Sequence, residues 1–116
     1  MDDKSVTPDP WAAIAAELRR IADDVETLVG TTPPGLFAVD VQPFGSLTYP
    51  PVPEQREVTI QAVDDVAHAL LGKPAEIKKM SDGKSVHCQA KGRRGRIYVS
   101  AYQAIAATDA ELEADR

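Results

Sequence analysis

The sequence predicts an α+β fold, a two-layer sandwich in which helices cover one face of a mostly antiparallel sheet of about four strands. Three observations support this prediction. An N-terminal segment repeats large apolar residues at helical spacing, and a central segment does so again. The last third of the chain alternates apolar and polar residues between turn-forming glycines. The expected order of elements is α-β-α-β-β-β.

The chain has 116 residues, which is the size of one small domain. Aromatic residues make up only 5% of it, so the core is built from Val, Ile, Leu and Ala and is thin. The expected segments are a flexible N-terminus (1–9), a single domain (10–105) and an acidic flexible tail (106–116), the domain comprising an N-terminal amphipathic helix (10–30), a Pro/Gly linker (31–35) and a sheet-containing body (36–105).

The first helix carries the clearest pattern in the chain. Asp9 is suited to cap it, Pro10 to occupy its first position and Gly30 to end it. Large apolar residues recur in steps of three and four, and smaller ones widen this stripe beyond the seam of a two-stranded coiled coil. Packing on a sheet or a broad partner surface is favoured, with a free-standing coiled coil as the alternative; either buries the stripe. Its residues are Trp11, Ile14, Leu18, Ile21, Val25 and Leu28.

The segment after the linker begins the body. Residues 36–42 alternate as a strand that Pro43 ends. Residues 57–71 are ambiguous, because their first part alternates like a strand while the whole repeats like a helix. We expect a helix from about residue 61 to residue 71, with a cap at Thr59 as an alternative start. An extended segment over residues 56–60 is compatible with the pattern, and the choice between strand and helix at residues 58–62 stays open.

The last third is predicted to be a meander. Strands are expected over residues 75–80, 84–90 and 96–105, with turns at 81–83 and 92–95. Alternation assigns one set of side chains to the buried face: Ala75, Ile77, Val86, Cys88, Ala90, Ile97, Val99 and Ala101. It assigns another set to the opposite face: His87, Gln89, Tyr98, Ser100 and Tyr102.

Charge is distributed unevenly around a net value of −5. Residues 73–96 hold eight Lys/Arg against two Asp/Glu, whereas the remainder holds five against sixteen. Such a basic segment can bind a polyanion or meet an acidic surface of a neighbour. A single cysteine, Cys88, fits a reducing compartment. With no secretory pattern and no apolar stretch of membrane-spanning length, we expect a cytoplasmic protein that does not enter a membrane.

One group of residues suggests contact with an anion or a nucleic acid. Aromatic side chains on an open sheet face, beside arginines in a turn, are how several modules stack bases and hold phosphates. The same residues also suit an ordinary strand of high β-propensity followed by a solvated turn. The candidates are Arg93, Arg94, Arg96, Tyr98, Tyr102 and His87.

No signature of catalysis, cofactor binding or metal binding is present in the sequence. His87 and Cys88 are adjacent on a strand and point to opposite faces, which prevents a thiolate–imidazole pair. His68 has no further ligand at metal-binding spacing. Glycine-rich phosphate loops and the common hydrolase, zinc and redox motifs are missing. We therefore expect no enzyme, no cofactor and no metal.

Three stretches carry a family resemblance: the stripe from Trp11 to Asp24, residues 63–72, and residues 86–99. In hydrophobic spacing and Ala/Asp/Arg-rich composition, the chain resembles small uncharacterised proteins of actinobacteria and actinobacteriophages over most of residues 11–105. The resemblance implies a cytoplasmic accessory protein, leaves a phage origin open, and supplies no activity and no site residue.

Together these features predict a non-enzymatic protein–protein interaction module. We expect it to self-associate as a homodimer through the stripe of the first helix and to bind a protein partner, with the arginines of the turn as a charged rim. The alternative is a small nucleic-acid-binding protein that uses the aromatic sheet face and the basic hairpin turn. The sequence leaves open whether the first helix packs within one chain or between chains.

Overall fold

The computed structural model of the protein describes residues 9–44, 51–79 and 86–113. The predicted flexible N-terminus up to residue 8 and the predicted turn at residues 81–83 lie outside this range. The chain divides into two compact units, Met1–Pro34 and Gly35–Arg116.

The first unit contains helix α1 (Pro10–Glu26). At its start, the Asp9 carboxylate accepts a hydrogen bond of 2.7 Å from the backbone N–H of Trp11, as the sequence predicts. At its end, the Thr27 hydroxyl donates to the Asp24 carbonyl at 2.6 Å and closes the last turn. The helix therefore ends four residues before Gly30, and Leu28 lies in the turn that follows.

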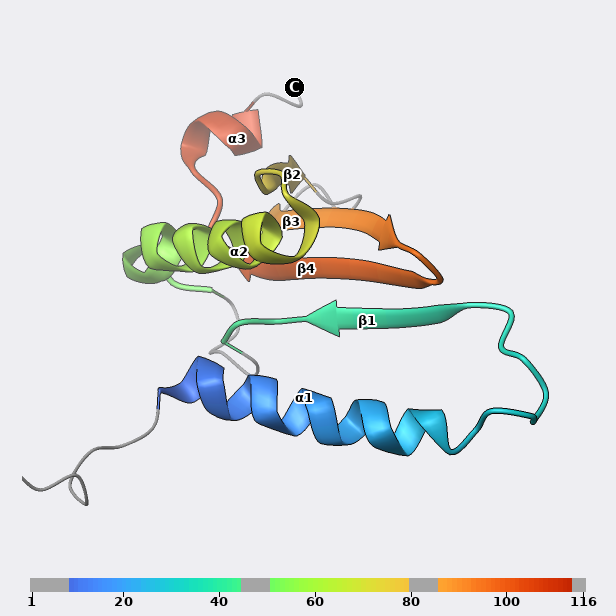
Figure 1. Cartoon of the computed structure of the whole chain (residues 1–116). Helices are drawn as coiled ribbons and strands as arrows, with labels where there is room; N and C mark the ends of the chain where they lie inside the picture. The colour runs from blue at the N-terminus through green and yellow to red at the C-terminus, as the bar shows by residue number, and fades with distance from the viewer. Residues whose placement is uncertain (1–8, 45–50, 80–85, 114–116) are drawn as a thin grey trace, which may run out of the picture. The chain divides into compact units, whose positions relative to one another are not determined.

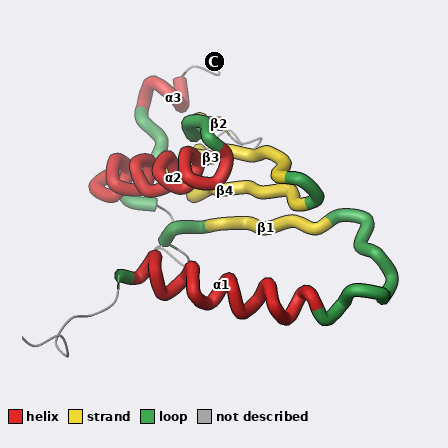
Figure 2. The backbone as a smooth tube through the Cα atoms, in the orientation of Figure 1, coloured by secondary structure: helices red, strands yellow, loops and turns green. Residues whose placement is uncertain are grey.

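The second unit is built on a four-stranded sheet in the order β1-β4-β3-β2 (Figures 1 and 2). Strand β1 (Phe37–Val41) is parallel to β4 (Ile97–Ile105), which is antiparallel to β3 (Val86–Arg94). Strand β2 (Glu76–Lys79) is antiparallel to β3 at the other edge. The predicted α+β class and the mostly antiparallel sheet of four strands are confirmed.

Helix α2 (Arg56–Leu71) follows a short 3-10 turn, η2 (Pro53–Gln55), and ends at Gly72 with a φ of +66°. The helix expected from about residue 61 begins five residues earlier, and the segment at 56–60, for which the sequence leaves strand or helix open, is the first turn of α2. Thr59 and Val63 are both buried and lie four residues apart on one helix face. A helix therefore buries more of this segment than a strand would. Of the apolar side chains in this first turn, only Val58 is exposed.

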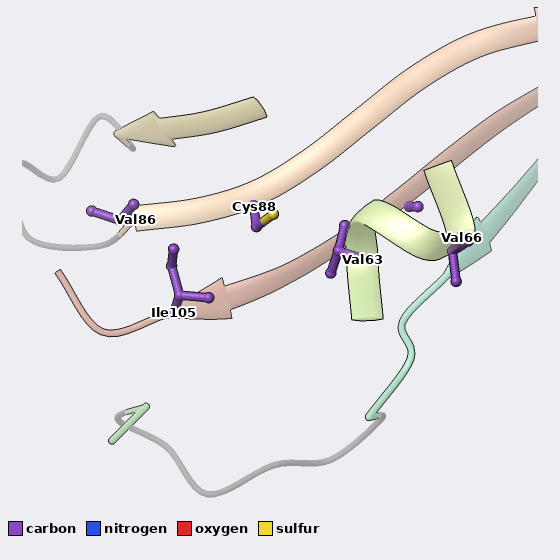
Figure 3. Close-up of a cluster of buried hydrophobic side chains, with 6 residues drawn as sticks. Val63, Val66, Val86, Cys88 and Ile105 are labelled. Atoms are coloured by element: carbon purple, nitrogen blue, oxygen red, sulfur yellow. The ribbon is translucent and has the colours of Figure 1, made fainter. Parts of the chain in front are cut away.

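The core lies between α2 and one face of β3 and β4 (Figures 1 and 3). It contains only small and medium-sized side chains, so the prediction of a thin core agrees with the structure. The partly buried Val41 of β1 packs against this core. Because side chains alternate along a strand, the odd-numbered residues of β1 lie on the core face of the sheet. The buried cluster is Val63, Val66, Val86, Cys88, Ala101 and Ile105.

Two residues predicted to be buried, Ile77 and Ile97, are exposed. Ile77 belongs to edge strand β2, and Ile97 opens β4 beside the hairpin turn. A Cβ added to Gly92 would come within 3.0 Å of the Leu71 side chain, so the end of α2 lies against β3 at this residue. The part of the hairpin beyond Gly92, toward Ile97, therefore extends past the last residues of α2.

The β3–β4 hairpin is longer than predicted. The turn expected over residues 92–95 is reduced to Gly95 and Arg96, and β3 continues through Arg94. Gly95 adopts a φ of +58°, the left-handed conformation that tight hairpin turns require and that glycine adopts at little cost. Gly92 is instead a strand residue whose missing side chain makes room for Leu71.

The segment expected to be a flexible tail contains a short helix, α3 (Asp109–Glu113). Thr108 and Glu111 form a reciprocal capping box, in which each backbone N–H donates to the other's side-chain oxygen at 3.1 and 2.9 Å. The Arg56 guanidinium donates to both carboxylate oxygens of Glu111, at 2.9 and 2.8 Å, and to the Ala106 carbonyl. This bidentate pair ties α3 to the start of α2.

We expect Glu111→Gln to lower the free energy of unfolding by about 1–2 kcal/mol at neutral pH, because it removes a charge-assisted pair that is mostly shielded from solvent. The hydrogen bond from Arg56 lowers the pKa of Glu111. The pair therefore contributes its full stability above the ordinary pKa of a glutamate and loses it as the pH falls through the lowered pKa. Urea titrations of both chains across acidic pH should converge at the acid end.

The matched control is Glu76→Gln, the same change at an exposed position on β2. Its unfolding curve should stay within about 0.5 kcal/mol of the natural chain at neutral pH. An equal effect of the two substitutions would mean that the Arg56–Glu111 pair does not stabilise the fold.

Candidate interaction surfaces

The apolar stripe of the first unit is exposed. The six predicted interface residues, from Trp11 to Leu28, are each between 42 and 58% exposed, and no residue of α1 is buried. Within the first unit, no described residue covers Leu18, Ile21 and Val25. A run of large apolar side chains along one helix, exposed to this degree, is typical of an interaction site.

The other sides of α1 are charged. Glu17 and Arg20 form an exposed ion pair at 2.6 Å. The last turn holds three carboxylates, Asp23, Asp24 and Glu26, and no basic residue, whereas the first turn holds no acidic residue. This arrangement opposes the helix macrodipole, which favours negative charge at the N-terminal end and positive charge at the C-terminal end. The sequence interpretation missed this asymmetry, although it is readable once the helix bounds are known.

The second surface is the sheet face opposite α2. Strand register places Tyr98 beside Arg93 and Tyr102 beside Gln89 across β3 and β4. Lys78 of β2 is the neighbour of His87. The residues predicted for this face by alternation do share it, because side chains alternate along each strand and paired residues lie on the same side.

His87 and Tyr102 stack on this face, with ring centroids 5.7 Å apart and ring planes inclined by 26°. The Gln42 side-chain amide donates to the Tyr102 hydroxyl at 3.0 Å. Both rings are partly buried, so their positions are fixed by neighbours. The structure thus brings together two of the aromatic residues that the sequence predicts, and it adds Gln42 to them.

The predicted arginines are distributed around the end of the hairpin. Arg93 lies on the open face beside Tyr98, Arg94 occupies the next position on the α2 side, and Arg96 is in the turn. All three are exposed, and within the described part of the chain none of them forms an ion pair. They can therefore contact an anion without breaking an interaction of the fold.

The open face also carries acidic groups. Parallel pairing of β1 with β4 places Asp40 beside Ser100, whose hydroxyl donates to the Asp40 carboxylate. Glu76 of β2 lies on the same side as Gln89. Alternation within residues 36–42 separates Asp40 from Val39 and Val41, but no local pattern places this strand next to Ser100. Basic side chains also occur along this face, because Lys91 pairs with Ser100 in the same row as Asp40. Of the exposed arginines at the hairpin end, Arg93 lies on this face and Arg96 in the turn.

The nucleophilic and acid–base side chains of Cys88 and His68 are either buried or in contact with another residue of the fold. Cys88 is fully buried, and burial raises the pKa of its thiol, which opposes thiolate formation at neutral pH. The His68 ring lies 2.9 Å from the Asp64 carbonyl oxygen and 3.3 Å from the Asp64 carboxylate. In residues 9–44, 51–79 and 86–113, no group of three or more His, Cys, Asp or Glu residues is arranged to hold a metal ion.

Comparisons with family models, with curated proteins and with solved structures find no match to this chain. In the described residues, no helix is both long enough and apolar enough to span a bilayer. The two surfaces are therefore interpreted from their own geometry.

Proposed function

We propose that this protein is a non-enzymatic interaction module that self-associates as a homodimer through α1. The observation that carries the proposal is the exposed stripe on a well-capped helix in which no residue is buried. Most helices in proteins owe their stability to the packing of an apolar face on another element. A partner that covers the stripe would supply that packing.

A second copy of the chain is the partner that requires no further component. Most soluble homo-oligomers are two-fold dimers, in which the same surface patch serves both chains. A helix with an exposed apolar stripe meets this requirement when its stripe packs against the stripe of another copy. The arginines of the hairpin, including Arg93 and Arg94, then remain at the surface as a charged rim for a further protein partner.

Sedimentation equilibrium over a dilution series tests the proposal. We expect a reversible monomer–dimer equilibrium between roughly 1 and 300 µM, the range that brackets a dissociation constant in the micromolar region. A monomer throughout the series would remove the self-association proposal. A capture experiment with the full chain addresses the additional protein partner separately.

The second candidate function is binding of single-stranded nucleic acid at the open sheet face. The observation that favours it is the juxtaposition of Tyr98 with Arg93, together with the His87–Tyr102 stack, beside arginines that form no ion pair with any described residue. Aromatic rings contribute to stacking with bases of any sequence, and exposed arginines neutralise phosphates. The contact is centred on the hairpin end, because Arg93 and Arg96 are exposed there.

Fluorescence polarisation with short single-stranded DNA and RNA probes tests this candidate. We expect Arg93→Ala/Arg94→Ala to weaken binding for all sequences. The slope of log affinity against log salt concentration should become shallower by about one for each phosphate that an arginine no longer neutralises. Arg19→Ala/Arg20→Ala removes the same charge from α1 and serves as the matched control. Equal weakening by both double variants, or no binding at low salt, would exclude the hairpin as a nucleic-acid surface.

A further inference from the structure

The stripe of α1 has a feature that constrains how two copies pair. In heptad terms, the positions of type a hold Trp11, Leu18 and Val25, and those of type d hold Ile14, Ile21 and Leu28. Parallel two-stranded coils favour β-branched residues at a and leucine at d. In the middle of this stripe the arrangement is the reverse, because Leu18 occupies an a position and Ile14 and Ile21 occupy d positions. A parallel dimer is therefore disfavoured by its packing.

An antiparallel pair avoids this conflict because each layer combines an a residue with a d residue. The steps along the stripe are three, four, three, four and three residues, and this series is the same in either direction. Two antiparallel copies can therefore align the stripe positions from Ile14 to Val25 within the helix, and they bring Trp11 beside Leu28 in the turn that follows it. The matched pairs are Trp11 with Leu28, Ile14 with Val25, and Leu18 with Ile21 of the other copy.

The charges of α1 also favour the antiparallel orientation. The carboxylates of the last turn, Asp23, Asp24 and Glu26, oppose the macrodipole of their own helix. In an antiparallel pair they lie beside the N-terminal end of the other helix, whose first turn has no acidic residue. The one carboxylate at that end, Asp9, is engaged with the Trp11 N–H as the N-cap. A parallel pair would instead bring both acidic ends and both negative dipole ends together.

One flank of the stripe carries Glu17 and Asp24, which approach their counterparts in the antiparallel pair. Arg20 lies on the same flank and already forms an ion pair with Glu17 at 2.6 Å. The like-charge contact is thereby reduced to a screened surface effect. It occurs twice in the symmetric pair and raises the dissociation constant by about two- to fivefold. The other flank is apolar, with Ala15 and Ala22, and permits close approach of the two helices.

We infer that two copies of this chain pair through antiparallel α1 helices, with the two-fold axis at the level between Leu18 and Ile21. This inference rests on the proposed self-association and specifies its orientation and register. The contact is isologous, so every pairing across it occurs twice. The two bodies of the dimer are then attached at opposite ends of the helix pair.

Disulfide trapping between two single variants tests the orientation. Ile14→Cys and Val25→Cys, each with a different affinity tag, are mixed and oxidised. The two positions are about 16 Å apart along one helix, much farther than the roughly 4.4–6.8 Å between Cα atoms that a disulfide spans. We expect the mixed Ile14→Cys/Val25→Cys disulfide to exceed both like-with-like disulfides by at least about tenfold. The natural chain, whose Cys88 is fully buried, is the control without a trapped dimer.

Three outcomes contradict the inference, and they differ in whether self-association itself is retained. Dominant like-with-like disulfides would indicate parallel helices and overturn the orientation while retaining self-association. Mixed and like disulfides in statistical proportion would indicate random collision and overturn the register. Monomers by sedimentation for the natural chain, with no trapped dimer, would overturn both the inference and the proposed function.

A second measurement leaves the stripe intact. A spin label on Ala12→Cys, an exposed position beside the stripe, reports the distance between the two copies. In the antiparallel pair the labelled residues are separated by about 22 Å along the helix axis, whereas in a parallel pair they lie at the same level. Pulsed electron resonance at a concentration that gives dimers should yield the longer distance. The shorter distance would overturn the inference even if the cysteine variants associate poorly.

Discussion

Leu18→Ala is expected to raise the dissociation constant of the dimer by about three orders of magnitude. Leu18 is on the exposed stripe, and in the antiparallel pair it faces Ile21 of the other copy at the centre of the contact. Each buried leucine truncated to alanine costs at least about 2 kcal/mol, and a symmetric dimer loses two, which gives about 4 kcal/mol. Sedimentation equilibrium of both chains over the same concentrations measures the effect.

Arg19→Ala is the matched control for this prediction. Arg19 is adjacent in sequence, exposed and on the polar side of α1, so its dissociation constant should stay within about threefold of the natural value. Both variants should retain the unfolding transition of the body, because the buried cluster contains no residue of α1. An unchanged dissociation constant for Leu18→Ala would show that the stripe is not the dimer contact.

Val63→Ala is expected to produce a large loss of stability of the body. Val63 is fully buried between α2 and the sheet. Removing two methyl-sized groups forfeits about 1.6 kcal/mol of burial, and the cavity left behind raises the cost to about 2–3 kcal/mol. For a body of this size, that corresponds to a fall in Tm of about 10 °C or more. Thermal unfolding followed by circular dichroism measures it.

Val58→Ala makes the same substitution on the same helix at a side chain that is 57% exposed. Both variants gain the same helix propensity from alanine, so the difference between them isolates burial. We expect Val58→Ala to lie within about 0.5 kcal/mol of the natural chain. Equal effects would contradict the position of Val63 in the core.

The fold was predictable where periodicity and capping are local. Asp9, Pro10 and the 3–4 spacing correctly predict the start of α1, and alternation correctly assigns Val86, Cys88 and Ala90 to the buried side. The start of α2 was missed because Val58 and Ile60 alternate like a strand over a few residues. The choice between strand and helix depends on tertiary packing, which buries Thr59 and Val63 on one face of the helix.

Contacts between distant segments were not predictable from local pattern. The parallel pairing of β1 with β4 joins residues about sixty positions apart and places Asp40 beside Ser100. The bidentate pair of Arg56 with Glu111 likewise joins α2 to the segment expected to be a flexible tail. In that segment a signal was present, because Thr108 and Glu111 have the spacing of a capping box.

For the candidate surfaces, the sequence correctly predicts which side chains share a face but not which of them are covered. The stripe of α1 follows from spacing alone, whereas its exposure in the single chain does not. His87 and Tyr102 were expected on one face, and their stacking depends on the β3–β4 register. Register follows from the whole hairpin, including the two-residue turn that the sequence interpretation placed too early.

The burial of Cys88 gives the protein a built-in reporter of opening. A thiol reagent reaches this sulfur only when α2 separates from β3, because the side chain is fully covered by the contact between them. The rate of labelling under native conditions therefore measures how often the body opens, without any introduced probe.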